Sequence, residues 1–150
     1  MGRVSTFHTV RVVEASQAVV WSVLIDYSGM TRWAGARSVT MERSGQGDPR
    51  GVGAIRVLKS WRGTIREEIT EFDPERRMGY RILSAVPADN YHGVIELSPS
   101  NGSTRIAWTN TFEPRTLAGP VVGVVIKSVI KGIVDRFVKV VSLEAKRSAP

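Results

Sequence analysis

Few side chains in this 150-residue chain have the types and spacing needed for acid–base chemistry. The clearest set lies in residues 64–72, where Glu67 and Glu71 alternate with Ile65 and Ile69 and so share one face of a predicted strand. If that face points inward, Glu67 is a buried carboxylate, which must be paired or change its pKa. Arg56, on the preceding predicted strand, is a candidate partner. Such a pair can anchor a ligand or transfer a proton.

The sequence does not decide whether this face of the strand points inward or outward. If it points outward, Arg56 and Glu67 belong to an outward-facing ladder with Arg66 and Glu68. Such a surface ladder is the commoner arrangement, because charged side chains are rarely buried.

Arg136 raises a similar question in the C-terminal segment. Its helical position places it near Val125, Val129 and Val140, inside or at the edge of the apolar arc. We expect it to extend to solvent or to form an internal salt bridge. The alternative is that Arg136 binds a carboxylate of a ligand.

Other catalytic or metal-binding patterns are missing from the sequence. With two histidines, no cysteines and no acidic cluster, the composition is unsuited to a metal site. We expect His8 and His92 to be structural or surface residues. The sequence contains neither a Gly-x-Ser-x-Gly nucleophile motif nor the Gly-Lys-Ser/Thr ending of a phosphate-binding loop. We therefore assign no catalytic residue, no metal and no cofactor.

The net charge of +7 is spread along the chain. Nucleic-acid-binding proteins cluster their basic residues and often interleave them with exposed aromatics, whereas these mostly alternate with apolar residues along predicted strands. The pattern is typical of a solvated sheet face, and we predict no nucleic-acid partner. Basic charge and the absence of cysteine favour a cytoplasmic location.

A long helix is predicted over residues 119–146, where apolar residues recur at three- and four-residue steps. Lys127, Lys131, Asp135 and Lys139 follow the opposite side and interrupt any membrane-spanning run. We expect this amphipathic helix to pack on its own domain, and a transient contact with a membrane surface is the alternative.

The rest of the chain predicts an antiparallel sheet that the helix covers. A strand over residues 4–14 precedes a short helix capped by Ser16, and residues 30–33 form another helical turn. Strands are predicted over residues 39–43, 52–61, 64–72, 78–85, 90–97 and 104–112, the last two joined by the Asn-Gly turn at residues 101 and 102. Without alternating strand–helix units, this order indicates an α+β fold in a single domain, residues 1–150.

Local sequences along this order resemble a known family. They are VWSVLIDY at residues 20–27 with Trp33, GVGAIR at 51–56, EFDP at 71–74 with Tyr80, and GSTRIAW at 102–108. Together they resemble the START-like, Bet v 1-like superfamily, in its polyketide cyclase/dehydrase and lipid-transport-like branch, over about residues 4–143. The resemblance implies a helix-grip fold, in which a seven-stranded antiparallel sheet wraps around the C-terminal helix and two short helices follow the first strand. It also implies an apolar cavity between sheet and helix.

We therefore expect a protein that binds a small hydrophobic molecule such as a lipid or a polyketide. Transport of that molecule is an additional option. The predicted ligand-binding residues are Trp33, Arg56, Glu67, Tyr80, Tyr91, Trp108, Asn110, Phe112, Ile126, Ile130, Ile133 and Phe137. The aromatics Trp33, Trp61, Tyr80, Tyr91, Trp108 and Phe112 are expected in the core, which merges with the cavity wall in this fold. Asn110 alternates with Trp108 and Phe112 and is the polar member of that wall, so it must find a partner.

Two other functions stay open. One is a polyketide cyclase, aromatase or dehydratase that uses Glu67, Tyr80, Tyr91, His92 or Asn110 as acid or base in the same cavity. The other is an interaction module whose cavity is filled by its own side chains. We expect the binding protein rather than the enzyme.

Overall fold

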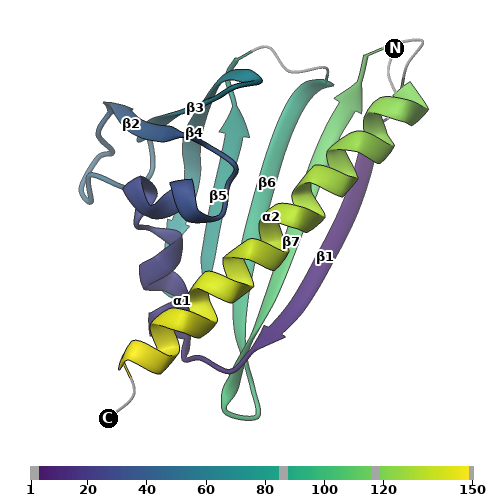
Figure 1. Ribbon diagram of the computed structural model, residues 1–150. Coiled ribbons are helices and arrows are strands. Elements are labelled where there is room, and N and C mark those ends of the chain that lie inside the picture. The colour runs from purple at the N-terminus through teal and green to yellow at the C-terminus, as the bar shows by residue number, and fades with distance from the viewer. Residues whose placement is uncertain (1–3, 85–87, 116–118, 149–150) are drawn as a thin grey trace.

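The computed structural model describes residues 4–84, 88–115 and 119–148 (Figure 1). Its strands are β1 (Ser5–Val13), β2 (Ser38–Arg43), β3 (Ile55–Ser60), β4 (Gly63–Asp73), β5 (Arg77–Ile82), β6 (Ala88–Ser100) and β7 (Ser103–Pro114). The helix α1 (Gln17–Leu24) and the 3-10 helix η1 (Tyr27–Arg32) follow β1, and α2 (Gly119–Ser148) follows β7. The predicted order of elements is confirmed, although some ends differ: the strand expected over residues 52–61 begins only at Ile55.

The strands form one seven-stranded antiparallel sheet in the order β1-β7-β6-β5-β4-β3-β2. Chain neighbours from β2 to β7 pair directly; short turns join β3 to β4, β4 to β5 and β6 to β7, whereas residues 44–54 connect β2 to β3. The predicted Asn-Gly hairpin joins β6 to β7, with Asn101 at φ 48° and Gly102 at φ 84°. Two successive positive φ angles are what a tight hairpin turn requires, and Asn and Gly adopt them at low cost.

The two short helices begin at residues whose side chains cap them. Ser16 Oγ accepts a hydrogen bond from the Val19 amide at 3.2 Å, which confirms the predicted cap of α1. Asp26 Oδ1 accepts one from the Gly29 amide at 3.3 Å at the start of η1. These caps satisfy backbone N–H groups that have no partner within the helix, and so define the place where the chain turns back over the sheet.

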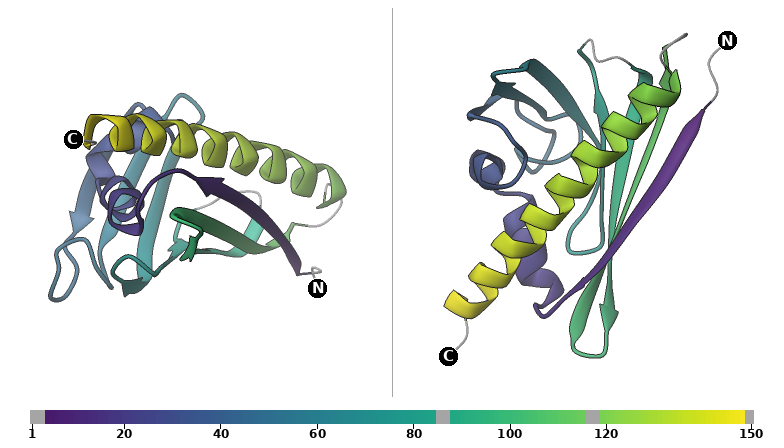
Figure 2. Two further views of the ribbon diagram at one scale, coloured as in Figure 1. Left: turned by 90° about the horizontal axis from the view of Figure 1, so that it is seen from below. Right: turned by 45° about the vertical axis from the view of Figure 1, so that its right-hand side comes forward.

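The long helix α2 lies diagonally across one face of the curved sheet (Figure 2). Only its C-terminal half is fully packed, since Val134, Phe137 and Val141 are completely buried. In the N-terminal half, Val121 and Val124 are 66% and 69% exposed. The apolar face of the helix is therefore longer than the surface that covers it.

A β-bulge between Ile69 and Glu71 changes the face to which Glu71 belongs. Glu67 and Ile69 are buried, but Glu71 is exposed and forms an ion pair with Arg77 at 2.7 Å. The prediction that Glu67 and Glu71 share a face is therefore wrong. A bulge adds one residue to a strand and interrupts the simple alternation on which the prediction depended.

Trp61 is the second difference from the sequence-based expectation. It was expected in the core but is 77% exposed at the turn between β3 and β4, where the Arg62 guanidinium carbon lies 5.1 Å from its ring centroid. The buried residues of β3 and β4 lie away from this turn, and Lys59, Gly63 and Thr64 beside it are exposed. A side chain at the tip of the hairpin therefore does not reach the core.

The outer face of the sheet carries much of the charge in ion pairs. Arg66 contacts Glu42 at 2.6 Å, and Glu68 contacts both Arg43 and Arg81 at 2.8 and 2.6 Å. The arginines of these pairs are exposed although the Glu68 side chain is only 15% exposed, and such surface pairs contribute little to stability individually. Their arrangement confirms the solvated sheet face expected from the alternation of charges. Among the described residues, no helix is long and apolar enough to cross a membrane.

The uneven packing of α2 predicts different effects for one substitution at two positions of the same helix. Val134→Ala removes two methyl groups from a completely buried site and should lower the free energy of unfolding by about 2 kcal/mol. Val124→Ala, at 69% exposure, should change it by less than about 0.5 kcal/mol. Urea denaturation of both variants tests this; equal effects would mean that the N-terminal half of α2 is as well packed as the C-terminal half.

Candidate ligand-binding cavity

A cavity of about 190 Å³ lies between the sheet and the N-terminal half of α2. Most of the predicted site residues line it, namely Trp33, Arg56, Glu67, Tyr80, Tyr91, Trp108, Ile126, Ile130 and Ile133. The structure thus brings together side chains from η1 and the residues that follow it, from the five strands β3 to β7, and from α2. Its wall is mainly apolar, and Arg56 and Glu67 are the only charged residues in it among those described.

Three predicted residues lie behind this wall rather than in it. Asn110 and Phe112 on β7 and Phe137 on α2 are completely or almost completely buried, at 0%, 1% and 0% exposure. Phe112 stacks on Tyr91 with ring centroids 5.4 Å apart, and Phe137 contacts the rings of Trp33 and Trp108. Their position supports the cavity wall from outside.

Other lining residues were not among those predicted. They are Met30, Ala34, Leu58, Ile65, Ile82, Ile95, Val125 and Val129. The signal for several was present, because Leu58, Ile65 and Ile95 follow the same two-residue alternation as Arg56, Glu67 and Tyr91. The sequence placed Val125 and Val129 inside or at the edge of the apolar arc of the helix, where helical spacing does not decide between the cavity and solvent.

Arg56 and Glu67 form a buried ion pair, which settles the orientation that the sequence left open. They are direct cross-strand partners in β3 and β4 and are only 3% and 8% exposed. Nε and Nη2 of Arg56 both lie 2.8 Å from Oε1 of Glu67. The outward-facing ladder is formed instead by Arg66 with Glu42 and by Glu68 with Arg43 and Arg81.

The guanidinium of Arg56 is also held by aromatic rings. Its central carbon lies 4.8 Å from the ring centroid of Tyr27 and 5.6 Å from that of Tyr80. Cation–π contacts of this kind are stronger when the cation is desolvated. The third guanidinium nitrogen, Nη1, is buried and has no hydrogen-bond partner among the described residues.

Hydrogen bonds connect four uncharged side chains at the back of the cavity. The Tyr80 and Tyr91 hydroxyls donate to Oδ1 of Asn110 at 3.1 and 2.9 Å, and Trp108 Nε1 donates to the Tyr80 hydroxyl at 3.1 Å. The Asn110 oxygen thus has the partners that the sequence predicted, whereas its buried Nδ2 has none among the described residues. The network fixes the rings of both tyrosines in the cavity wall.

Gly93 provides the space in which Tyr80 reaches Asn110. The three residues are aligned across β5, β6 and β7, with Gly93 directly between the other two. A Cβ atom at Gly93 would lie 2.5 Å from the Tyr80 hydroxyl oxygen, which shows that the ring lies flat over this glycine. Any side chain here would occupy the path of the ring.

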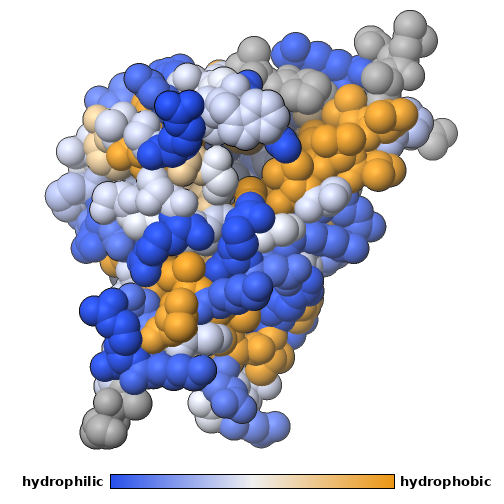
Figure 3. Space-filling model, viewed as in Figure 1, coloured by the Kyte–Doolittle hydropathy of each residue, from blue (hydrophilic) through white to orange (hydrophobic). Residues whose placement is uncertain are grey.

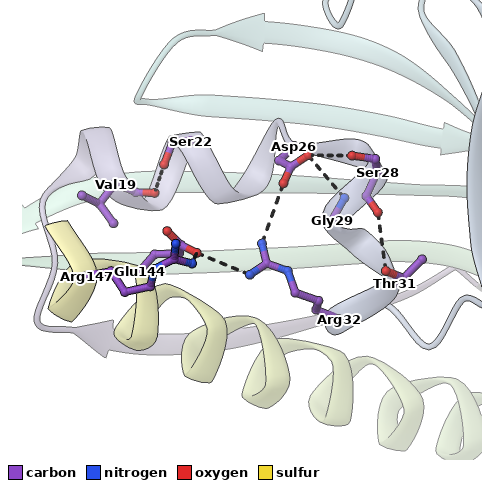
Figure 4. Close-up of polar contacts among 9 residues, drawn as sticks. All are labelled: Val19, Ser22, Asp26, Ser28, Gly29, Thr31, Arg32, Glu144 and Arg147. Atoms are coloured by element: carbon purple, nitrogen blue, oxygen red, sulfur yellow. Dashed lines mark hydrogen bonds and ion pairs between the residues drawn. The ribbon is translucent and has the colours of Figure 1, made fainter.

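The contacts around η1 position Trp33 in the wall. Arg32 lies within 3.7 Å of Asp26 and 3.5 Å of Glu144, and so connects η1 to the C-terminal part of α2 (Figure 4). Arg136 is exposed and donates from Nε to the Trp33 carbonyl at 3.0 Å. It therefore extends to the surface of α2 and holds the backbone of Trp33, and it does not line the cavity.

The histidines lie outside the cavity. His8 bonds to Thr109 and His92 to the Asn90 carbonyl, and both side chains are exposed on the outer face of the sheet. His92 was a candidate acid or base for an enzyme reaction, and its orientation removes it from that role. The expectation of surface histidines is confirmed.

Burial controls the ionisation of the tyrosines in this region. Desolvation raises the pKa of Tyr27 to about 12, although the nearby charge of Arg56 opposes the rise. Desolvation likewise raises the pKa of Tyr80 and of Tyr91 well above the ordinary range. All three hydroxyls are therefore neutral at physiological pH and act as hydrogen-bond donors rather than as bases.

Comparison with known proteins places this geometry in a family. Residues 5–142 match the family model described as polyketide cyclase / dehydrase and lipid transport. The chain belongs to this family. No curated protein sequence matches it.

Solved structures share the fold of this family member at low sequence identity. An uncharacterised protein from Bacillus thuringiensis is 18% identical with a TM-score of 0.74, covering 91% of this chain and 98% of its own. Ara h 8.0201 is 15% identical with a TM-score of 0.74 over 93% and 98% of the two chains. A protein from Thermobifida fusca is 23% identical with a TM-score of 0.72 over 93% and 94%. At these identities the likeness shows the fold, which confirms the predicted Bet v 1-like helix-grip architecture.

The close contact at Gly93 predicts that Gly93→Ala displaces Tyr80 in this family member. The added methyl group would overlap the Cζ atom and the hydroxyl of the ring, so the Tyr80–Asn110 hydrogen bond should break. We expect a loss of roughly 2 kcal/mol in the free energy of unfolding, from overpacking together with the unpaired polar groups. Urea denaturation measures it. Tyr80→Phe combined with Gly93→Ala is the control, because the double variant should lose little more than Gly93→Ala alone; an additive loss would contradict the contact.

The tyrosines also predict a loss of stability in alkali. Their pKa values are higher in the folded chain than the ordinary value of about 10 in the unfolded chain. Above pH 10 the folded state therefore binds more protons, so stability is complete below that pH and falls as the pH rises through it toward about 12. Absorbance titration should show no tyrosinate near pH 10 in the folded protein and all three tyrosines ionising there in urea. Ionisation at the ordinary pH in the folded chain would show that these hydroxyls are solvated.

Proposed function

We propose that this protein binds a small, mainly hydrophobic molecule in the cavity between the sheet and α2. The single observation that carries the proposal is a cavity of about 190 Å³ whose wall combines aliphatic and aromatic side chains with one buried ion pair. Apolar pockets with a few well-placed polar groups are typical ligand sites. A module whose interior is filled by its own side chains would leave no such space.

The size of the cavity limits the ligand. Pockets for drug-sized molecules usually measure about 300–1,000 Å³, and an apolar cavity of roughly 150 Å³ holds one benzene ring. The space here therefore fits a compact molecule with one or two rings better than a complete lipid. Within the family description, this favours a polyketide-like ring compound over lipid transport.

The N-terminal half of α2 offers a route into the cavity. Apolar side chains gather along this half of the helix, and the surface is hollowed beside them (Figure 3). Val125 and Val129 line the cavity and are also 53% and 37% exposed. A ligand can therefore pass between apolar surfaces from solvent to the interior without crossing the ion pairs of the outer sheet face.

An acid–base enzyme of the cyclase or dehydratase type is the second candidate, because the Glu67 carboxylate lines the cavity. Its Oε1 is engaged by Arg56, and the neutral tyrosines do not supply a base. Binding is therefore the better-supported function. The two candidates differ in the fate of the ligand, so mass spectrometry of the compound recovered after incubation distinguishes an unchanged ligand from a product.

Filling the cavity should abolish binding. Ile126→Trp adds a large side chain in the wall contributed by α2, where the residue is only half-buried and the helix can accommodate it. We expect at least about a tenfold loss in affinity for the two-ring fluorescent probe naphthylamine, which is neutral at physiological pH, measured by fluorescence titration, since the space for the rings is lost.

Val124→Trp is the matched control, because Val124 lies on the same half of the helix but outside the cavity wall. Circular dichroism should show that both variants are folded. If both lose the probe equally, the probe binds on the surface of α2, and if neither does, it binds elsewhere; in both cases the cavity is not the site.

A further inference from the structure

We infer that the ligand carries a hydrogen-bond donor, such as a phenolic or enolic hydroxyl, and that Oε2 of Glu67 accepts the hydrogen bond from it. The inference rests on the proposed binding function and adds a chemical class to it. It also states a selectivity: the site prefers a ring compound with a hydroxyl group to the same compound with a methyl group in its place.

The carboxylate of Glu67 has one oxygen left for a ligand. Its side chain lines the cavity and is 11% exposed, against 4% for the side chain of Arg56. Oε1 lies 2.8 Å from both Nε and Nη2 of Arg56. Oε2 has no hydrogen-bond partner among the described residues and, unlike Nη1 of Arg56, is not completely buried. The surface that the Glu67 side chain retains therefore includes an acceptor atom.

The neighbours of Glu67 on the inner face of the sheet supply no further donor. Ile82 lies directly opposite it on β5, and Ile65 is two residues away on β4; both line the cavity and both are aliphatic. The two tyrosine hydroxyls of the wall donate to Asn110 instead. Within the described part of the chain, a donor for Oε2 must therefore come from the contents of the cavity. A ligand that displaces water from this oxygen without replacing its hydrogen bond loses affinity.

The charge of Glu67 favours a donor over any other polar group on the ligand. An ionised carboxylate can only accept hydrogen bonds, and those that it accepts are stronger than bonds between two neutral groups. A ligand carbonyl or carboxylate next to Oε2 would place two acceptors together in a desolvated site and leave both without a partner. Because Arg56 holds Oε1, the carboxylate is oriented before the ligand arrives, which lowers the entropic cost of binding.

Three naphthalenes substituted at the same ring position test the inference with the unmodified protein: naphthol, methylnaphthalene and methoxynaphthalene. Naphthol carries a donor, methylnaphthalene has almost the same shape without any polar group, and methoxynaphthalene keeps the oxygen but has lost the donor. We expect naphthol to bind at least about tenfold more tightly than either of the others, measured by equilibrium dialysis at neutral pH, where naphthol is uncharged. A cavity that offers no acceptor would give the opposite order, because methylnaphthalene is the more hydrophobic compound.

The outcomes separate this inference from the proposed function. If none of the three probes binds, the cavity is not a binding site and the proposed function fails. If methylnaphthalene binds as well as naphthol, the proposed function stands but the hydrogen bond to Glu67 is refuted. If methoxynaphthalene binds as well as naphthol and methylnaphthalene does not, the site recognises an acceptor and the inferred chemical class is wrong.

Glu67→Gln should remove the preference for naphthol. Nε of Arg56 needs an acceptor, so the amide oxygen takes the place of Oε1 and the amide nitrogen, a donor, takes the place of Oε2. We expect the affinity for naphthol relative to methylnaphthalene to fall at least about tenfold, and the affinity for methoxynaphthalene relative to methylnaphthalene to rise.

Glu68→Gln is the matched control, because it makes the same change at the neighbouring residue on the outer face, where Glu68 pairs with Arg43 and Arg81. It should leave all three relative affinities unchanged. An equal fall in both variants would show that the preference follows the net charge of the protein and would overturn the role of Glu67. Circular dichroism checks that both variants are folded, and the three probes with the unmodified protein stay decisive if Glu67→Gln is not.

Discussion

The contact of Phe137 with Trp33 and Trp108 holds the long helix and the short helices to the sheet. The ring of Phe137 lies 4.9 Å from that of Trp33 and 5.9 Å from that of Trp108, so one cluster connects α2, the end of η1 and β7. C-terminal to this cluster, α2 is packed into the core. N-terminal to it, the helix separates from full contact with the sheet, and the cavity occupies that space. Each buried ring contributes about 2–3 kcal/mol through apolar burial alone.

The buried Arg56–Glu67 pair is poorly explained by stability. Moving two charges out of water costs several kcal/mol per ion, and apolar residues of similar size often hold two strands together at least as well. The structure offsets that cost through two contacts with one carboxylate oxygen and two aromatic rings, but it leaves a third nitrogen unpaired. The pair is therefore an expensive and incomplete interaction, which stability alone does not account for.

More of the fold than of the site could be predicted from the sequence. Alternation, turn residues and the helical period of residues 119–146 indicated the elements, and the resemblance supplied their arrangement. The direction of Arg56 and Glu67 could not be predicted, because alternation defines two faces without saying which is inner. Glu71 was assigned to the wrong face because the bulge after Ile69 has no simple sequence signal. The separation of Asn110, Phe112 and Phe137 from the cavity depends on packing depth, which residue spacing does not contain.

Access to the cavity explains why α2 leaves apolar residues in solvent. Val121, Val124 and Val125 are each more than half exposed, and full burial of a valine would contribute about 1.5 kcal/mol or more. A helix packed along its whole length would gain several kcal/mol, but it would also close the cavity that Val125 and Val129 now border. Folding stability and access to the cavity therefore compete along one helix. The boundary between them lies where Ile130 and Ile133, still in the cavity wall, give way to the buried Val134 and Phe137.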